Sequence, residues 1–314
     1  MTPHTDIRDS RLLYGCMGLG GDWDTRPWTA ADLAHAETAI QAAVEAGITA
    51  FDHADIYRHG KSEAVFGEVL ARAGGLRERI LLQTKCGIRL PDGDRAGRYD
   101  LRGPAITRRV EESLTRLRTD VIDVLLLHRP DPLARPQEIA EALTALHEQG
   151  LVRRFGVSNM SAAQIAALQA SLDVPLVVNQ LEMSLARRDW VESGVLVNTS
   201  AAAANGFPHG TLEYCAAQGI RLQAWGPLAQ GRFTGRADTR AAQLVGELAA
   251  RKGTTPETIL LWWLQRHPAG IAPVIGTTRP ERIRACRDAV HRAVDLTHEE
   301  WYDLWVAARG APLP

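Results

Sequence analysis

The chain has 314 residues, of which 45% are hydrophobic and 23% charged, as in a globular protein with one large domain or two ordinary ones. Its formal net charge of -1 gives no electrostatic reason to expect nucleic acid or an anionic membrane surface as a partner. Residues 1–15 contain no apolar segment of signal-peptide length, and no stretch approaches the roughly 18 apolar residues of a membrane-spanning helix.

The four cysteines are too widely spaced for a CxxC metal site or for a small disulfide scaffold. We therefore expect free thiols and a cytoplasmic protein, because thiols persist in a reducing compartment. The cysteines stand at Cys16, Cys86, Cys215 and Cys286.

Apolar segments of strand length alternate along the chain with segments of helical period. The strands are expected over residues 12–17, 48–54, 79–86, 121–128, 153–159, 175–183, 221–228 and 271–277. The helices between and after them are expected over residues 30–47, 61–74, 107–118, 136–150, 161–172, 194–206 with 210–219, 240–253 with 256–267, and 279–290. One more amphipathic helix is expected within residues 296–314, on the outside of the fold.

The strands are nearly continuous in apolar residues, as parallel strands buried on both faces should be. Eight β/α units in about 300 residues predict a closed (β/α)8 TIM barrel, one domain over residues 1–314. The alternative is a doubly wound sheet, which would need a glycine-rich turn leading directly into the first helix. Residues 15–24, "GCMGLGGDWD", are rich in glycine, but the helix begins only near Ala30. The pattern therefore favours the barrel.

Polar or aromatic residues follow nearly every predicted strand. The C-terminal ends of parallel barrel strands meet at one rim, where the chemistry of such folds gathers. A single histidine, lysine or tyrosine at a strand end is more often structural than catalytic, but several in one pocket perturb one another's pKa values and indicate a functional site. The residues at this rim are, in strand order, Asp52, Asp55 and Tyr57, then Lys85, His128, Ser158 with Asn159, Asn179 with Gln180, Trp225, and the segment 276–283.

Four of these residues, here called the polar quartet, suit one kind of chemistry: Asp52, Tyr57, Lys85 and His128. An unperturbed tyrosine has a pKa of about 10, and a neighbouring ammonium lowers it by stabilising the phenolate. A carboxylate beside the lysine keeps the lysine charged and oriented, and an imidazole can hydrogen-bond a substrate oxygen. Together they predict a tunable general acid directed at a carbonyl oxygen.

Seven motifs, in this order, make the chain resemble the aldo-keto reductases over roughly residues 10 to 295. They are "FDHADIY", "TKCG", "DVLLLHRPD", "RRFGVSN", "NQLEMS", "AWGPLAQGRF" and "PVIGTTRPERI". The resemblance implies a (β/α)8 barrel that binds NADPH, rather than NADH, without a Rossmann domain. It also implies that the catalytic residues are Asp52, Tyr57, Lys85 and His128, with Tyr57 as the proton donor. The family spacing favours Asp52 over Asp55 as the catalytic aspartate. Because all four are present, we expect an active enzyme that reduces an aldehyde or ketone.

The resemblance also assigns cofactor contacts. Ser158, Asn159 and Gln180 would hold the nicotinamide carboxamide, and Trp225 would stack on the ring, where many relatives have Tyr. The pyrophosphate would lie along Gly226, Leu228, Gln230 and Gly231, with Arg232 near. The 2′-phosphate would be held by the segment after the last strand, with Gly276, Thr277, Thr278, Arg279 and Arg282 as candidates. Arg282 is preferred because a guanidinium pairs bidentately with phosphate.

Three further positions are notable. Many relatives have a Glu and an Asn that hold the adenine where this chain has Ala285 and Cys286. Trp23, in the first β/α loop, is a candidate for the substrate pocket, although ordinary packing explains it as well.

Three other functions remain open. The physiological direction could be oxidation of an alcohol or a sugar, or the chain could be a low-turnover regulatory barrel that senses NADPH. An unrelated barrel enzyme, such as a metal-dependent hydrolase or a phosphate-binding isomerase, could use His53, Asp55 and His128 as ligands. No H-x-H pair stands at a strand end, so we expect no metal.

Overall fold

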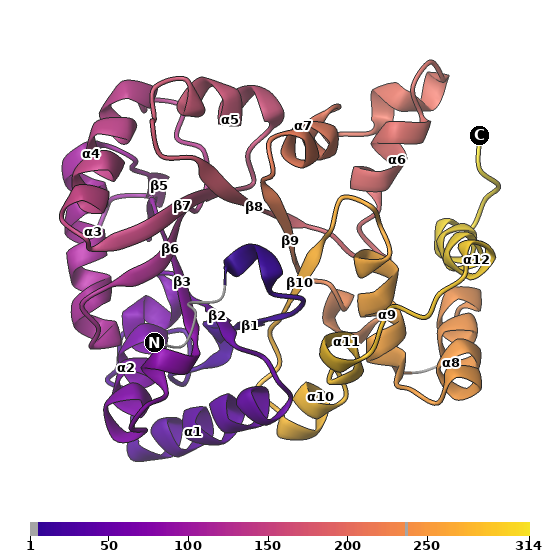
Figure 1. Ribbon diagram of the computed structural model, residues 1–314, viewed down its shortest axis with the longest axis horizontal. Coiled ribbons are helices and arrows are strands. Elements are labelled where there is room, and N and C mark those ends of the chain that lie inside the picture. The colour runs from indigo at the N-terminus through magenta and orange to yellow at the C-terminus, as the bar shows by residue number, and fades with distance from the viewer. Residues whose placement is uncertain (1–5, 236–237) are drawn as a thin grey trace.

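The computed structural model describes residues 6–235 and 238–314, and its centre is a closed barrel of eight parallel strands (Figure 1). Around the barrel the strands follow the order β1-β10-β9-β8-β7-β6-β3-β2. Their bounds are β1 Leu13–Gly15, β2 Ala50–Asp52, β3 Leu81–Cys86, β6 Ile122–Leu127, β7 Val152–Ser158, β8 Leu176–Glu182, β9 Arg221–Trp225 and β10 Ala272–Ile275.

The α-helices lie outside the barrel and cover its strands (Figure 1). Their bounds are α1 Ala30–Glu45, α2 Lys61–Arg72, α3 Gly103–Leu117, α4 Pro136–Glu148, α5 Ala162–Gln169, α6 Asp189–Val195, α7 Thr211–Ala217, α8 Arg240–Lys252, α9 Pro256–Gln265, α10 Pro280–Arg284, α11 Asp288–His291 and α12 His298–Arg309. Within the described ranges, none of these helices combines the length and the apolar character that crossing a bilayer requires.

Burial on both faces explains the apolar strands. Every residue of β3 and of β6 is buried, because one face lines the barrel interior and the other meets the surrounding helices. The interior cluster includes Leu13, Leu126 and Val178, and Ile7 joins it from the short 3-10 helix that precedes β1. This 3-10 helix lies at the N-terminal ends of the strands, so the open rim of the barrel is the one at their C-terminal ends.

Side-chain caps fix where several helices begin. Thr29 and Asp32 form a capping box at the start of α1, and Ser161 and Gln164 form one at the start of α5. Each box satisfies backbone N–H groups that have no partner inside the helix. These helices therefore begin where the sequence predicts them.

The predicted C-terminal helix is present as α12 and packs against α8 and α9. The indole rings of Trp263 and Trp301 stack with their centroids 5.2 Å apart, and each indole N–H donates to the other residue's carbonyl oxygen. Lys252 of α8 also pairs with Glu300 at 2.9 Å.

Two features differ from the sequence-based expectation. The helix predicted over residues 194–206 is wrong in its bounds: α6 ends at Val195, and the alanine run forms only a 3-10 turn, Ser200–Ala204. Asn198 between them has a left-handed φ of 62°, which a continuous helix does not permit. The second feature is an unexpected antiparallel hairpin after β3, made of β4 Ile88–Arg89 and β5 Arg98–Tyr99.

Candidate active site

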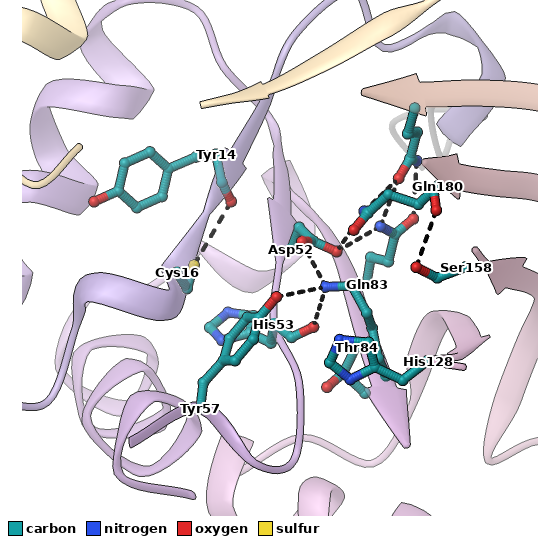
Figure 2. A network of polar contacts seen from close by, with 12 residues as sticks. Tyr14, Cys16, Asp52, His53, Tyr57, Gln83, Thr84, His128, Ser158 and Gln180 are labelled. Atoms are coloured by element: carbon teal, nitrogen blue, oxygen red, sulfur yellow. Dashed lines mark hydrogen bonds and ion pairs between the residues drawn. The ribbon is translucent and has the colours of Figure 1, made fainter. Parts of the chain in front are cut away.

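The polar quartet converges at the C-terminal rim of the barrel, where Figure 2 shows Asp52, Tyr57 and His128 lying together and Lys85 contacts two of them. Lys85 Nζ donates to Asp52 Oδ2 at 2.6 Å and lies 3.0 Å from the Tyr57 hydroxyl. A third bond, 2.8 Å long, runs from Lys85 Nζ to the backbone carbonyl of His53. The rings of Tyr57 and His128 stand nearly perpendicular, with centroids 6.1 Å apart. Residues far apart in the sequence thus form one cluster around the lysine.

Strand register explains how Lys85 reaches Asp52. Asp52, the last residue of β2, is level with Gln83 of β3. Side chains alternate along a strand, so Lys85 lies on the same face as Gln83, two residues closer to the rim. The ammonium can therefore lie between the Asp52 carboxylate below it and the Tyr57 hydroxyl.

The backbone after Tyr57 is strained. Arg58 and His59 both adopt the left-handed region, with φ of 52° and 58°, which costs roughly 1–3 kcal/mol for each such residue. Two contacts hold Arg58 in place: its Nε donates to the carbonyl of Met17 at 3.1 Å, and its guanidinium lies 5.6 Å from the centroid of the Trp23 ring. The sharp turn is thus anchored to the loop that follows β1.

The pKa of Tyr57 differs from the sequence-based expectation. Burial raises it above 10, Lys85 opposes that rise, and Asp52 adds to it. The lysine acts in the predicted direction, but the loss of solvent around a phenolate outweighs it. For Lys85, burial disfavours the charge, yet Asp52 and then Tyr57 outweigh burial and raise the lysine pKa above 10.5. At neutral pH the site therefore holds an ammonium beside a protonated phenol.

His128 is neutral in this environment. Burial lowers its pKa well below 6.5, and the positive charges of Lys85 and Arg129 lower it further. A neutral imidazole has one N–H to donate and one nitrogen to accept. Its Nδ1 is buried and lacks a hydrogen-bond partner among residues 6–235 and 238–314.

Three buried glutamines, here called the glutamine layer, lie beneath the quartet: Gln83, Gln180 and Gln223. The Nε2 atoms of Gln83 and Gln180 donate to Asp52 Oδ1 at 2.6 and 3.1 Å (Figure 2), and both also donate to Gln223 Oε1. Lys85 occupies the other carboxylate oxygen. Both oxygens of Asp52 are thus held, which fixes the carboxylate that orients the lysine.

Asp55 lies away from this arrangement. Its carboxylate is buried 3.6 Å from Arg109 Nε of α3 and does not line the cavity described below. Burial raises its pKa to about 7, and repulsion from Glu63 adds to the rise.

A cavity of about 640 Å³ lies at the rim, next to the quartet. Tyr57, His128 and Asp52 line one part of it, together with Trp23, Met17, Ile56 and Arg129. From there the lining continues past the ends of β7, β8 and β9 to the segment after β10. The residues on that side are Ser158, Asn159, Gln180, Trp225, Gly226, Pro227, Leu228, Ala229, Gln230, Gly231, Thr234, Glu257, Gly276, Thr277 and Arg282.

Hydrogen bonds order the middle of this cavity. Trp225 Nε1 donates to Asn159 Oδ1 at 3.2 Å, and Asn159 Nδ2 donates to Ser158 Oγ at 2.7 Å. The Ser158 hydroxyl donates in turn to the backbone carbonyl of Gln180. Side chains from the ends of β7 and β9 are thereby tied to each other and to the backbone of β8, beside the quartet.

A model of the aldo/keto reductase family matches residues 11–305. The chain belongs to the aldo/keto reductase family. A 6-dehydroglucose reductase of Agrobacterium fabrum is 36% identical to it, over 96% of this chain and 95% of that protein. The oxidoreductase YdhF of Escherichia coli is also 36% identical, over 88% of each. A solved aldo/keto reductase of Klebsiella pneumoniae, in complex with NADP and acetate, has a TM-score of 0.72 and 27% identity, over 97% of this chain and 92% of that one. The predicted family, the (β/α)8 fold and the oxidoreductase class are confirmed.

The sequence assigns cofactor contacts to a set of residues. Most of them lie in the wall of the cavity of this aldo/keto reductase, and three do not. The guanidinium of Arg232 lies 5.6 Å from the centroid of the Phe233 ring. Thr278 packs against Gly18: the methyl group of Thr278 lies 2.7 Å from the position that a Cβ on residue 18 would occupy. Arg279 is exposed and caps the start of α10 with its backbone. The cofactor role of every residue in this set, inside the cavity or outside it, stays a prediction.

The sequence-based prediction did not include several residues of this site. Gln83 and Gln223 are polar residues inside apolar strands, each two positions before a rim residue, Lys85 and Trp225, and that spacing was the available signal. Arg129 directly follows His128 inside the motif "DVLLLHRPD", but the sequence-based prediction assigned a role in that motif to His128 alone. In the part of the chain that the structure describes, no three His, Cys, Asp or Glu side chains are grouped as a metal ion would require.

Proposed function

We propose that this chain reduces an aldehyde or ketone to an alcohol with NADPH, using Tyr57 as the proton donor. The observation that carries the proposal is the bond between Lys85 Nζ and the Tyr57 hydroxyl beside a large cavity. The names of its relatives, among them a 6-dehydroglucose reductase, favour reduction as the direction.

The cavity suits an extended nucleotide. A Cβ added at Gly226 or at Gly276 would meet no atom within 4 Å, so open space borders the backbone on this side. Ala229 and Gln230 both have positive φ values, which turn the chain sharply along the cavity wall. Arg282 lines the far part with an exposed guanidinium suited to the 2′-phosphate of NADPH. The Klebsiella pneumoniae structure with NADP supports the same cofactor here.

When bound, NADPH supplies the hydride, and the chain supplies orientation and the proton. Ser158, Asn159 and Gln180 would hold the carboxamide, and the Trp225 indole would lie against the ring. Gln180 already has its Nε2 donors committed to Asp52 and Gln223, so its amide is fixed in orientation.

The quartet performs the proton transfer. The neutral His128 donates a hydrogen bond to the substrate oxygen and places it near the Tyr57 hydroxyl. Tyr57 gives its proton to that oxygen as negative charge develops there. Lys85 stabilises the phenolate left behind, which opposes the effect of burial on Tyr57, and Asp52 keeps the ammonium in place.

The test is the variant Tyr57→Phe, assayed on a panel of aldehydes and ketones by the loss of nicotinamide absorbance with NADPH and with NADH. We expect a loss of kcat of about 100-fold or more, because general acid catalysis contributes roughly that factor. Binding of NADPH, followed by quenching of tryptophan fluorescence, should stay within about threefold. Turnover at the wild-type rate by Tyr57→Phe would show that another group donates the proton.

Two outcomes with the wild-type protein favour the alternatives. Tight NADPH binding without turnover of any carbonyl compound would favour a regulatory barrel. Faster oxidation of alcohols with NADP+ than reduction of the matching carbonyls, at equal saturation, would favour a dehydrogenase.

A further inference from the structure

One charged side chain at the substrate part of the cavity has no role in the proposed chemistry. Arg129 follows His128 in the loop after β6 and lines the same cavity as Tyr57 and His128. Its charge acts on His128, whose pKa it lowers. Arg129 therefore borders the part of the cavity where a carbonyl oxygen would bind.

The carboxylates near this loop are already engaged. Asp131 Oδ1 accepts a hydrogen bond from the backbone N–H of Leu133, and Asp131 Oδ2 accepts one from Leu101. Asp52, the acid that lines the same part of the cavity, is paired with Lys85. Among residues 6–235 and 238–314, no hydrogen bond or ion pair joins the Arg129 side chain to another residue.

The rest of this cavity mouth is apolar. Met17 and Trp23 are 51% and 43% exposed, which is high for large apolar side chains. Arg58 contacts both residues, by its bond to the backbone carbonyl of Met17 and by lying over the Trp23 ring. The exposed indole of Trp23 offers a flat wall for the carbon skeleton of a ligand.

Building on the proposed function, we propose that Arg129 is a specificity-determining residue that binds an oxyanion on the substrate, and that the preferred substrates are short aldehydes or ketones carrying a carboxylate or a phosphate. A guanidinium without a protein partner matches such a group bidentately. His128 and Arg129 are consecutive, and both line this part of the cavity. The carbonyl and the oxyanion of one substrate would then lie in the same part of the cavity, whose lining also includes Trp23.

The experiment compares kcat/KM within matched pairs of substrates in the wild-type protein and in Arg129→Met. The pairs are succinic semialdehyde against its amide, and glyceraldehyde 3-phosphate against glyceraldehyde, so that carboxylate and phosphate are tested separately. We expect the wild type to prefer at least one charged member by about tenfold or more, since bonds to charged groups have that effect. Arg129→Met should reduce the preference to within about threefold, mainly through KM, and Arg129→Lys should keep part of it.

Arg108→Met is the matched control, because Arg108 lies on α3 with an exposed side chain and the same charge is lost. It should keep the wild-type preference, and loss of the preference in this variant would attribute it to overall charge and overturn the assignment. Thermal unfolding should show that Arg129→Met is folded.

Failure of the inference and failure of the proposed function are distinguishable. Equal kcat/KM within both pairs, or a preference that survives Arg129→Met, would overturn the role of Arg129 while leaving carbonyl reduction intact. A preference for glyceraldehyde that depends on Arg129 would indicate recognition of hydroxyl groups and would also overturn the oxyanion. Absence of NADPH-dependent turnover of every pair member would refute the proposed function itself, and this inference with it.

Discussion

Replacement of Lys85 by methionine should destabilise the fold as well as remove activity. The ammonium is 1% exposed and makes hydrogen bonds to Asp52, His53 and Tyr57, and Met fills similar space without any donor. The substitution leaves the carboxylate of Asp52, a residue that is 2% exposed, with Gln83 and Gln180 as its side-chain donors among the described residues. Removing one partner of a buried ion pair costs about 3–5 kcal/mol. We expect the free energy of unfolding of Lys85→Met to fall by that amount.

The assay is urea unfolding followed by tryptophan fluorescence, on Lys85→Met, Asp52→Asn and the double variant. The double variant has no uncompensated charge, so it should recover more than half of the loss seen in Lys85→Met. Lys61→Met is the control, because its pair with Asp24 is close to solvent and its loss should cost far less. Single losses that simply add in the double variant, to within about 0.5 kcal/mol, would refute a coupled buried pair.

Two further predictions concern Asp55 and Arg282. Burial raises the pKa of Asp55 from 3.8 to about 7. Protonated Asp55 therefore contributes its full stabilisation of the folded state below pH 4, and this stabilisation is lost as the pH rises towards 7. Asp55→Asn should thus gain stability over the wild type across that range, by on the order of 4 kcal/mol at most, as measured by urea unfolding at several pH values; a difference that is constant with pH would contradict this. Arg282→Met should weaken NADPH binding about tenfold or more, with little effect on NADH, in fluorescence titrations. Equal weakening of both cofactors would show that Arg282 does not distinguish the 2′-phosphate.

The sequence by itself determined the barrel and which residues meet at its rim. Period-2 and period-3.6 patterns in order along the chain specify alternating strands and helices, and parallel strands must bring their C-terminal ends together. The sequence alone therefore places Asp52, Lys85 and His128 in one cluster, since each stands at the end of a predicted strand. The helix predicted over residues 194–206 failed because alanine favours a helix locally, whereas the chain there turns at Asn198.

Only the tertiary structure decided how the site is supported and charged. The bonds from Gln83 and Gln180 to Asp52 depend on strand register, which the linear order of residues does not reveal. The raised pKa of Tyr57 is the balance of burial against Lys85, and both effects depend on distances and on solvent access in the folded chain. Likewise, only the folded chain shows that Arg129 lines the cavity and that its side chain has no hydrogen-bond or ion-pair partner among the described residues. Pattern fixes which strand a side chain extends from, but packing sets the electrostatic environment in which it acts.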